Sequence, residues 1–190
     1  VNIVTCDAGG DNYYASIIKV QNCKFNKILK TDQNIIGVLY RNLTLLLNMN
    51  PSRHIYKVMG LAPYTNSKYF KNTLKFFKTL LKVKKIDFIV SKKLTDKFFY
   101  FKKHLDTERF DNIAGAIQKF CEDILLIWFK NIFKRTKCHS FIFSGGVANN
   151  VKANQILANQ KFVKNLWIPP GPGDESLSIG AVYNFIKNKL

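Results

Sequence analysis

The stretch that decides the fold reads Phe141-Ile-Phe-Ser-Gly-Gly-Val-Ala-Asn-Asn150. Its first three residues form an apolar run of aromatic and branched side chains, which is typical of a short buried strand. Gly145 and Gly146 carry no Cβ, so the backbone can turn sharply there and let a ligand approach closely. Either Asn149 or Asn150 can cap a helix over about 150–160. The pattern therefore predicts a strand, a tight turn and a helix.

Such a junction has two interpretations. The first N–H groups of the helix are unpaired and lie at the positive end of its dipole, so the turn can seat a phosphate or a ribose. Gly-Gly turns are also common in ordinary strand–turn–helix joints that bind nothing. The local pattern leaves both interpretations open.

Length and composition indicate a globular protein. The chain has 190 residues, of which 47% are hydrophobic and 22% charged, enough for one domain with a substantial core. No uncharged apolar run reaches the ~18 residues of a membrane span, so we expect no membrane segment. The start, Val1-Asn-Ile-Val-Thr5, has neither an initiator Met nor the character of a secretory signal. We expect the chain to be part of a longer, cytoplasmic protein.

The net charge of +18 raises the possibility of a polyanion-binding protein. Arginine, the preferred fork for bases and phosphates, occurs only at positions 41, 53, 109 and 135. The lysines are spread along the whole chain rather than gathered in one stripe, which argues against nucleic acid as the partner. The four cysteines form no C-x-x-C pair, so zinc and thioredoxin-type sites are not expected and reduced thiols are the simplest account.

The N-terminal part predicts a hairpin followed by a helix. Val1–Cys6 and Tyr13–Val20 read as two strands joined by the turn Asp7-Ala-Gly-Gly-Asp11, and Lys24–Lys30 as a further strand. Apolar residues at three- and four-residue spacing predict a helix over Ile35–Asn48.

Four further elements are expected downstream. Residues 66–103 are rich in Lys and Phe, and Phe70–Leu81 forms an amphipathic helix that packs on its own domain or lies on a membrane surface. The longest helix spans about 111–134, with Asp111 as its N-cap. Val163–Ile168 predicts a strand. Leu177–Leu190 predicts a last helix that packs closely through its central glycine.

Four ordered stretches carry a resemblance to one family. Ser144-Gly-Gly-Val-Ala-Asn-Asn150, continuing to Asn154, resembles the Ser-Gly-Gly-Val…Asn-x-x-x-Asn signature of the O-carbamoyltransferases of nodulation-factor, antibiotic and polysaccharide pathways. Lys57-Val-Met-Gly-Leu-Ala-Pro-Tyr64 is similar to a second motif of that family. The stretch 109–118 resembles the family's helix before the Gly-Gly turn, and 173–181 its closing motif.

The resemblance implies an α/β fold of the actin-like ATPase (ASKHA) type, and this chain resembles the C-terminal part of the carbamoyl-transfer domain. Residues 1–190 would then form a single partial domain with a variable helical insertion at about 66–105. The resemblance covers nearly the whole chain and is weakest over 66–103.

It also implies a site. In the family, Asp7 and Asp174 fall at positions that ligate a divalent metal, Fe²⁺ or similar, and Lys57 is the candidate catalytic residue, as a point charge for a phosphate or carbamoyl oxygen. Gln118 is expected to reach the site from the long helix. The positions expected to hold the nucleotide are Gly10, Asp11, Ser144, Gly145, Gly146, Asn150 and Asn154.

The implied activity has two steps. A separate domain makes carbamoyl adenylate from carbamoyl phosphate and ATP, and the domain resembled here moves the carbamoyl group to a hydroxyl of a sugar or natural product. The family's H-x-x-x-H metal pair is missing from this chain and is expected upstream of Val1. Two departures leave an alternative, a catalytically inactive fragment or paralogue: Ala8 replaces a family Gly, and Ile55 replaces a Glu. A basic, polyanion-binding protein is the third hypothesis.

Overall fold

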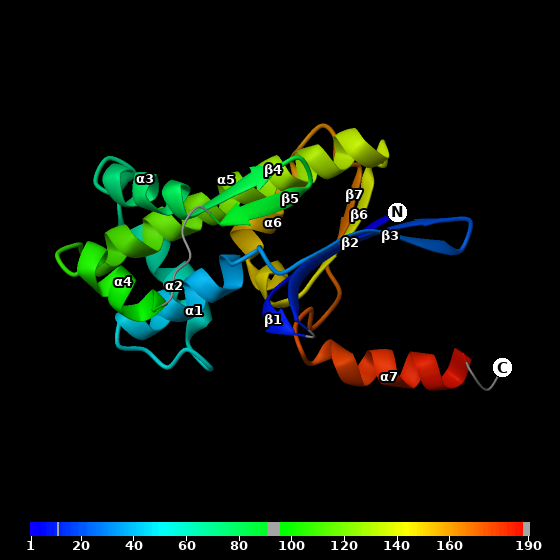
Figure 1. Cartoon of the computed structure of the whole chain (residues 1–190), viewed down its shortest axis with the longest axis horizontal. Helices are drawn as coiled ribbons and strands as arrows, with labels where there is room; N and C mark the ends of the chain where they lie inside the picture. Colours follow the sequence, from blue (N-terminus) through cyan, green and yellow to red (C-terminus); the bar gives the residue numbers. More distant parts are fainter. Residues whose placement is uncertain (11, 91–95, 188–190) are drawn as a thin grey trace.

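The structure is a computed structural model, which describes residues 1–10, 12–90 and 96–187. Figure 1 gives its course from end to end. The strands are β1 (Asn2–Gly10), β2 (Tyr13–Gln21), β3 (Lys24–Thr31), β4 (Leu81–Lys84), β5 (Asp87–Val90), β6 (Ser140–Ser144) and β7 (Asn165–Trp167). The helices are α1 (Ile36–Leu46), α2 (Ile55–Leu61), α3 (Lys71–Leu80), α4 (Lys97–Leu105), α5 (Phe110–Thr136), α6 (Val151–Ala158) and α7 (Ser176–Lys187), with short 3₁₀ turns η1 (Ala62–Tyr64) and η2 (Gly146–Asn149).

The centre of the fold is a five-stranded mixed sheet in the order β3-β2-β1-β6-β7. β1, β2 and β3 form an antiparallel meander, whereas β1, β6 and β7 run parallel. The predicted α/β class, the opening hairpin and the third strand are therefore confirmed. Because parallel strands end at one edge of a sheet, the ends of β1 and β6 lie together, and this edge carries the candidate site.

One face of the sheet is covered by helices. Val4 on β1 and Phe141 and Phe143 on β6 are buried on this face, and the Phe129 ring of α5 packs against both phenylalanines at centroid distances of 5.2 and 5.1 Å. α1 packs against β1, and α5 runs past α2, α3 and α6. Alternation of buried and half-buried residues along β1 and β6 follows from the two-residue period of a strand.

The long helix begins differently from the expected start. Arg109, in an extended conformation, is its N-cap and makes no side-chain cap bond, whereas Asp111 lies in the first turn. The Asp111 carboxylate instead accepts hydrogen bonds from the Arg109 guanidinium at 3.1 and 3.0 Å. The prediction of Asp111 as the N-cap is therefore wrong, because the helical backbone already begins at Phe110 and Asp111 lies inside the first turn, where negative charge is favourable.

The segment 66–105 contains more than helices. Between α3 and α4 lies the two-stranded hairpin β4–β5, which was not expected and which pairs Leu81 with Val90. The hairpin packs on α5 through Trp128, whose indole N–H donates to the Ile86 carbonyl at 2.7 Å. β4 alternates leucine or valine with lysine and β5 contains no lysine, and each strand has only four residues, which is too short a pattern to be separated from the helical pattern around it.

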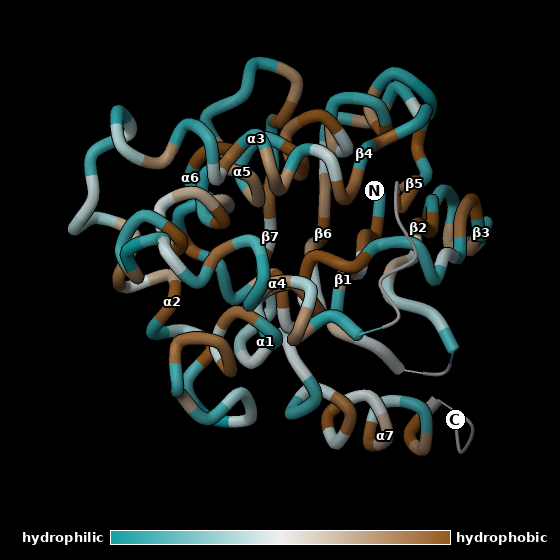
Figure 2. Tube along the Cα trace, turned by 60° about the vertical axis from the view of Figure 1, so that its left-hand side comes forward, coloured by the Kyte–Doolittle hydropathy of each residue, from teal (hydrophilic) through white to brown (hydrophobic). Residues whose placement is uncertain are grey.

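The last two elements also differ from expectation. β7 is shorter than the predicted strand over Val163–Ile168. α7 does not pack as predicted: a Cβ on Gly180 would meet no atom within 4 Å, and the helix stands apart from the body of the molecule in both Figure 1 and Figure 2. None of the helices within residues 1–10, 12–90 and 96–187 combines the length and the hydrophobicity of a membrane-spanning segment.

Candidate functional site

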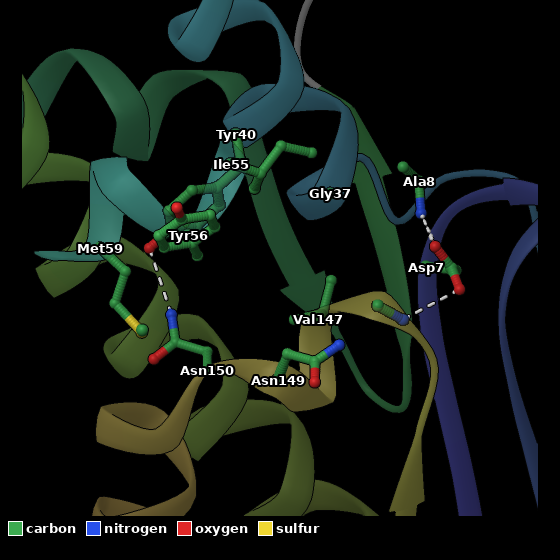
Figure 3. Close-up of a pocket in the computed structure, with 11 residues that line it drawn as sticks. Asp7, Ala8, Gly37, Tyr40, Ile55, Tyr56, Met59, Val147, Asn149 and Asn150 are labelled. Atoms are coloured by element: carbon green, nitrogen blue, oxygen red, sulfur yellow. Dashed lines mark hydrogen bonds between the residues drawn. The ribbon is translucent and has the colours of Figure 1, made fainter. Parts of the chain in front are cut away.

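A cavity of about 510 Å³ opens where β1 and β6 end. Such a volume lies within the ~300–1,000 Å³ of small-molecule sites. Four segments line it: the end of β1, the first turns of α1, the helix α2, and the Gly-Gly turn with η2 (Figure 3). The lining residues are Asp7, Ala8, Gly37, Tyr40, Ile55, Tyr56, Met59, Gly146, Val147, Asn149 and Asn150.

The Asp7 carboxylate bridges the two parallel strands at their ends. Its Oδ1 accepts a hydrogen bond from the Ala8 N–H at 2.6 Å, and its Oδ2 accepts one from the Gly146 N–H at 2.9 Å. Figure 3 shows both bonds at the wall of the cavity. A carboxylate held by two backbone donors keeps a fixed orientation and retains lone pairs for a further contact.

The Gly-Gly turn requires glycine at its first position. Gly145 has a φ of +94°, and a Cβ there would collide with the Cys6 carbonyl of the neighbouring strand. Its N–H donates to the Pro172 carbonyl at 2.7 Å, and Ser144 Oγ donates to the same carbonyl at 3.0 Å. The loop before α7, which contains Asp174, is therefore tied to the end of β6.

A second close approach brings α1 to the same place. A Cβ on Gly37 would lie 2.8 Å from the Ala8 backbone nitrogen, so only glycine lets α1 approach the last residues of β1 this closely. Asn34 fixes this arrangement, because its Nδ2 donates to Cys6 Sγ at 3.1 Å while its Oδ1 accepts from the Ile36 N–H at 3.1 Å.

A buried polar network forms the floor of the cavity. Gln118 and Asn150 pair through both side-chain amides, each bond being 3.0 Å long. Tyr40 donates its hydroxyl to Gln118 Oε1 at 2.8 Å and accepts from Asn150 Nδ2 at 3.3 Å. Gln118 Nε2 also donates to Glu122 Oε1 at 2.9 Å. Complete pairing of buried polar groups makes this floor rigid.

The network sets the protonation of its members. Burial raises the pKa of Tyr40 well above its ordinary value, so its hydroxyl stays neutral and acts as a donor. Burial also raises the pKa of the adjacent Cys121 thiol to about 12. Tyr40 and Cys121 are therefore unsuited to act as a base or a nucleophile at neutral pH.

Of the two cap candidates, Asn149 and Asn150, the structure selects Asn150 for α6, because its Oδ1 accepts from the Ala153 N–H at 3.0 Å. The same oxygen and both amide protons are already engaged in the network, so Asn150 supports the cavity floor from beneath. Asn154 donates to the Ala148 carbonyl at 2.7 Å, and its Oδ1 is buried without a partner among the described residues.

The structure brings together only some of the predicted site residues. Asp7, Gly146 and Asn150 line the cavity, and Ser144 and Gly145 lie directly behind them. Lys57 and Asp174 are exposed and do not line it, although Lys57 shares α2 with three lining residues. Gly10 is exposed at the end of β1, and Asp11 lies outside the described residues. The roles proposed for these residues stay predictions.

Sequence reasoning missed Gly37, Tyr40, Tyr56 and Met59 as lining residues. A signal existed for Tyr40. It lies four residues after Ile36 and three before Leu43, on the buried face of α1, and a buried tyrosine hydroxyl needs a partner.

The described residues do not by themselves assemble a metal site. In the described residues, no group of three or more His, Cys, Asp or Glu side chains could hold a metal ion. Ca²⁺ binds six to eight oxygen ligands, and Mg²⁺ binds six in an octahedral arrangement. Asp7 fits such an ion as one oriented carboxylate at the cavity wall, and other ligands must come from elsewhere.

Fold and cavity together define an α/β domain with a candidate small-molecule site near the carboxyl ends of its parallel strands. The family description "Carbamoyltransferase N-terminus" matches residues 2–183. The chain belongs to the carbamoyltransferase family.

The similar proteins extend well beyond the matched part. Protein MJ1051 of Methanocaldococcus jannaschii is 33% identical over 190 residues, which covers 94% of this chain and 36% of that protein. Protein sll1178 of Synechocystis is 28% identical, covering 77% of this chain and 26% of that protein. The chain thus spans about a quarter to a third of these relatives.

One solved structure is a distant neighbour. Component A of the (R)-2-hydroxyglutaryl-CoA dehydratase of Acidaminococcus fermentans aligns with a TM-score of 0.48 and 14% identity, over 89% of this chain and 55% of that chain. A likeness at this level carries no argument about function.

Proposed function

We propose that this chain is the part of an O-carbamoyltransferase that seats carbamoyl adenylate and presents its carbamoyl group to a hydroxyl of a sugar or natural product. The observation that carries the proposal is the position of the cavity, which lies between the two family motifs, the Gly-Gly turn and the α2 stretch. Ile55, Met59 and Val147 offer an apolar slot of the kind that suits a planar base.

In this proposal the oxygen of the acceptor hydroxyl forms a bond to the carbamoyl carbon and releases its proton to solvent, the bond from that carbon to the phosphate oxygen breaks, and AMP leaves with the electron pair of that bond. Asp7, fixed by the Ala8 and Gly146 N–H groups, faces the phosphate end of the cavity. A divalent cation held partly by Asp7 and Asp174 would supply positive charge that stabilises the leaving phosphate. Lys57 would contribute a second positive charge from α2.

Calorimetric titration of AMP, with and without Mn²⁺, into the full-length gene product tests this function. Metal-dependent binding should weaken at least about tenfold in Asp7→Asn, because a charge-assisted contact contributes roughly 1.5–3 kcal/mol. The matched control is Asp123→Asn on α5, whose carboxylate pairs with Lys78 of α3 and with Lys119 of α5, away from the cavity. Absence of AMP binding to the unmodified protein would exclude the proposal.

A catalytically inactive relative is the second candidate, and Ile55 favours it. This side chain lines the cavity at the position where the family resemblance implies a carboxylate that bonds a nucleotide hydroxyl. Ile55→Glu should raise AMP affinity about tenfold if the site binds nucleotide, since one charge-assisted hydrogen bond contributes roughly 1.5 kcal/mol. No gain, together with no binding to the unmodified protein, would favour the inactive relative.

A further inference from the structure

A second cavity, of about 490 Å³, lies against α1 and reaches the end of β1. Gly37 and Tyr40 of α1 line the first cavity. Val38 and Arg41, each one residue further along the helix, line the second. Because successive helix residues point about 100° apart, the two cavities flank α1. Ala8 lines both of them, so they meet at the end of β1.

The first cavity gives a bound carbamoyl adenylate a direction. Figure 3 shows Met59 at one end of this cavity and Asp7 with Ala8 at the other. In the proposed function the base occupies the apolar slot that includes Met59, and the phosphate faces Asp7. The carbamoyl group is joined to the phosphate on the side away from the ribose, so it lies beyond Asp7 at the Ala8 end. An acceptor hydroxyl has to approach from this end, where the second cavity meets the first.

The second cavity carries an excess of positive charge. Its charged lining residues are Arg41, Lys97 and Asp96, two positive and one negative. Asp96 caps α4, because its Oδ1 accepts a hydrogen bond from the Phe99 N–H at 3.1 Å. In the part of the chain that the structure describes, neither Arg41 nor Lys97 forms an ion pair. A guanidinium and an ammonium on the wall of one cavity suit a carboxylate or phosphate group of a ligand.

Two aromatic side chains share this wall. Tyr14 and Phe98 line the second cavity, and both are half-buried. The Tyr14 ring lies against Gly9, where an added Cβ would be 2.9 Å from the ring carbon Cε1, so the ring is held beside the end of β1. A flat apolar ring offers a packing surface for the face of a sugar ring. The aromatic and charged groups together fit a sugar that carries an anionic group.

We propose that the second cavity holds the acceptor, and that the acceptor is a sugar bearing a carboxylate or a phosphate. The inference rests on the proposed function, since the direction of carbamoyl adenylate decides where the acceptor lies. Arg41 and Lys97 bind the anionic group. The Tyr14 ring packs on the sugar, so that one hydroxyl faces the carbamoyl carbon near Ala8. The hydroxyl oxygen then bonds to that carbon, its proton goes to solvent, and AMP leaves with the electron pair of the broken bond.

Calorimetric titration of three sugars into the full-length gene product, with AMP and Mn²⁺ present, tests the inference. The probes are glucose, glucuronate and glucose 1-phosphate, which represent a neutral, a carboxylate and a phosphate acceptor. At least one of the two anionic sugars should bind about tenfold more tightly than glucose, which is the effect of one charge-assisted hydrogen bond. The sugar that binds more tightly identifies the anionic group as a carboxylate or a phosphate.

Replacement of the cations assigns this preference to the second cavity. Arg41→Met should lower the affinity for the preferred sugar about tenfold, to near that for glucose, and should leave the affinity for AMP unchanged. Lys97→Met should act in the same direction. The matched control is Arg135→Met, an exposed arginine near the end of α5 that lines neither cavity, and it should change neither affinity.

Each contrary result has a separate meaning. Equal affinity for the three sugars, or an unchanged affinity in Arg41→Met, would overturn the inference, while AMP binding to the same samples leaves the proposed function standing. Inorganic phosphate that binds as tightly as glucose 1-phosphate would overturn the inference in favour of a simple anion site. Absence of AMP binding to the unmodified protein would instead refute the proposed function, and with it the acceptor role of the second cavity.

Discussion

The amide pair beneath the cavity makes a measurable contribution to stability, and replacement of Asn150 isolates it. Asn150→Ala removes the two hydrogen bonds between the side-chain amides of Asn150 and Gln118 and the hydrogen bond that Asn150 donates to the Tyr40 hydroxyl. It also removes the helix cap, in which Asn150 Oδ1 accepts from the Ala153 N–H. Gln118 keeps Glu122, and Tyr40 keeps Gln118, so most partners retain one bond. Each net hydrogen bond contributes about 1 kcal/mol to the free energy of unfolding, and the cap contributes about 1 kcal/mol. Because the partners can form some new hydrogen bonds after the replacement, the expected loss of stability is about 2–4 kcal/mol.

Asn150→Ser divides this loss into two parts. Serine is a good cap but is too short to pair with the Gln118 amide, so it should lose about 1 kcal/mol less than alanine. The neighbouring Asn149→Ala, at an exposed position, is the control and should stay within about 0.5 kcal/mol of the unmodified protein.

Urea unfolding followed by circular dichroism measures these free energies, and thermal unfolding gives a second estimate. A loss of about 2–4 kcal/mol corresponds to a fall in Tm of about 4–16 °C for a domain of this size. If both Asn150 variants unfold within about 0.5 kcal/mol of the unmodified protein, the network does not hold the cavity floor and the reasoning fails.

Three further outcomes are expected. Burial raises the pKa of the Cys6 and Cys121 thiols, whereas Cys23 is exposed. In an Ellman titration of the folded chain Cys23 should therefore react fast, and Cys6 and Cys121 should react only on unfolding. Modification of Cys6 or Cys121 in the folded protein would contradict their burial. Because the pKa of Cys121 rises from 9.0 to about 12, the unfolded thiol ionises first, and stability should fall as pH rises through this window; a flat denaturation profile would contradict it. Gly145→Ala should prevent soluble folding, because Gly145 has a φ of +94° and an added Cβ would collide with the Cys6 backbone. Gly60→Ala, in α2 where an added Cβ meets nothing within 4 Å, should instead raise the free energy of unfolding by about 0.5–1 kcal/mol. Soluble expression and urea unfolding compare the two variants, and equal behaviour would refute the steric account.

Local patterns predicted most of the fold. The hairpin, α1, the long helix and the strand–turn–helix at Gly145 follow from periodicity and glycine placement, which are properties of neighbouring residues. The hairpin β4–β5 and the position of α7 could not be predicted, because both depend on what their faces contact in space. A four-residue strand carries too little pattern, and a helix that is apolar on most sides gives no direction in which to pack.

The site was predicted only in part for the same reason. Asp7 and the Gly-Gly turn follow from their motifs, and the structure places them in contact. The wall contributed by Gly37 and Tyr40 depends on α1 meeting the end of β1, which is a tertiary contact that no local spacing encodes. Motifs thus predicted part of the cavity lining, and packing between distant segments decided the other side chains that enclose it.

The Pro172 carbonyl accepts hydrogen bonds from both Ser144 and Gly145, which are 28 and 27 residues earlier in the chain. Two segments that are distant in sequence therefore behave as one mechanical part. Anyone who grafts the Gly-Gly turn from a relative into this scaffold should transfer 168–175 with it, because the donors of the turn would otherwise face a loop of different length. The natural unit of recombination in this domain is thus a pair of separated segments.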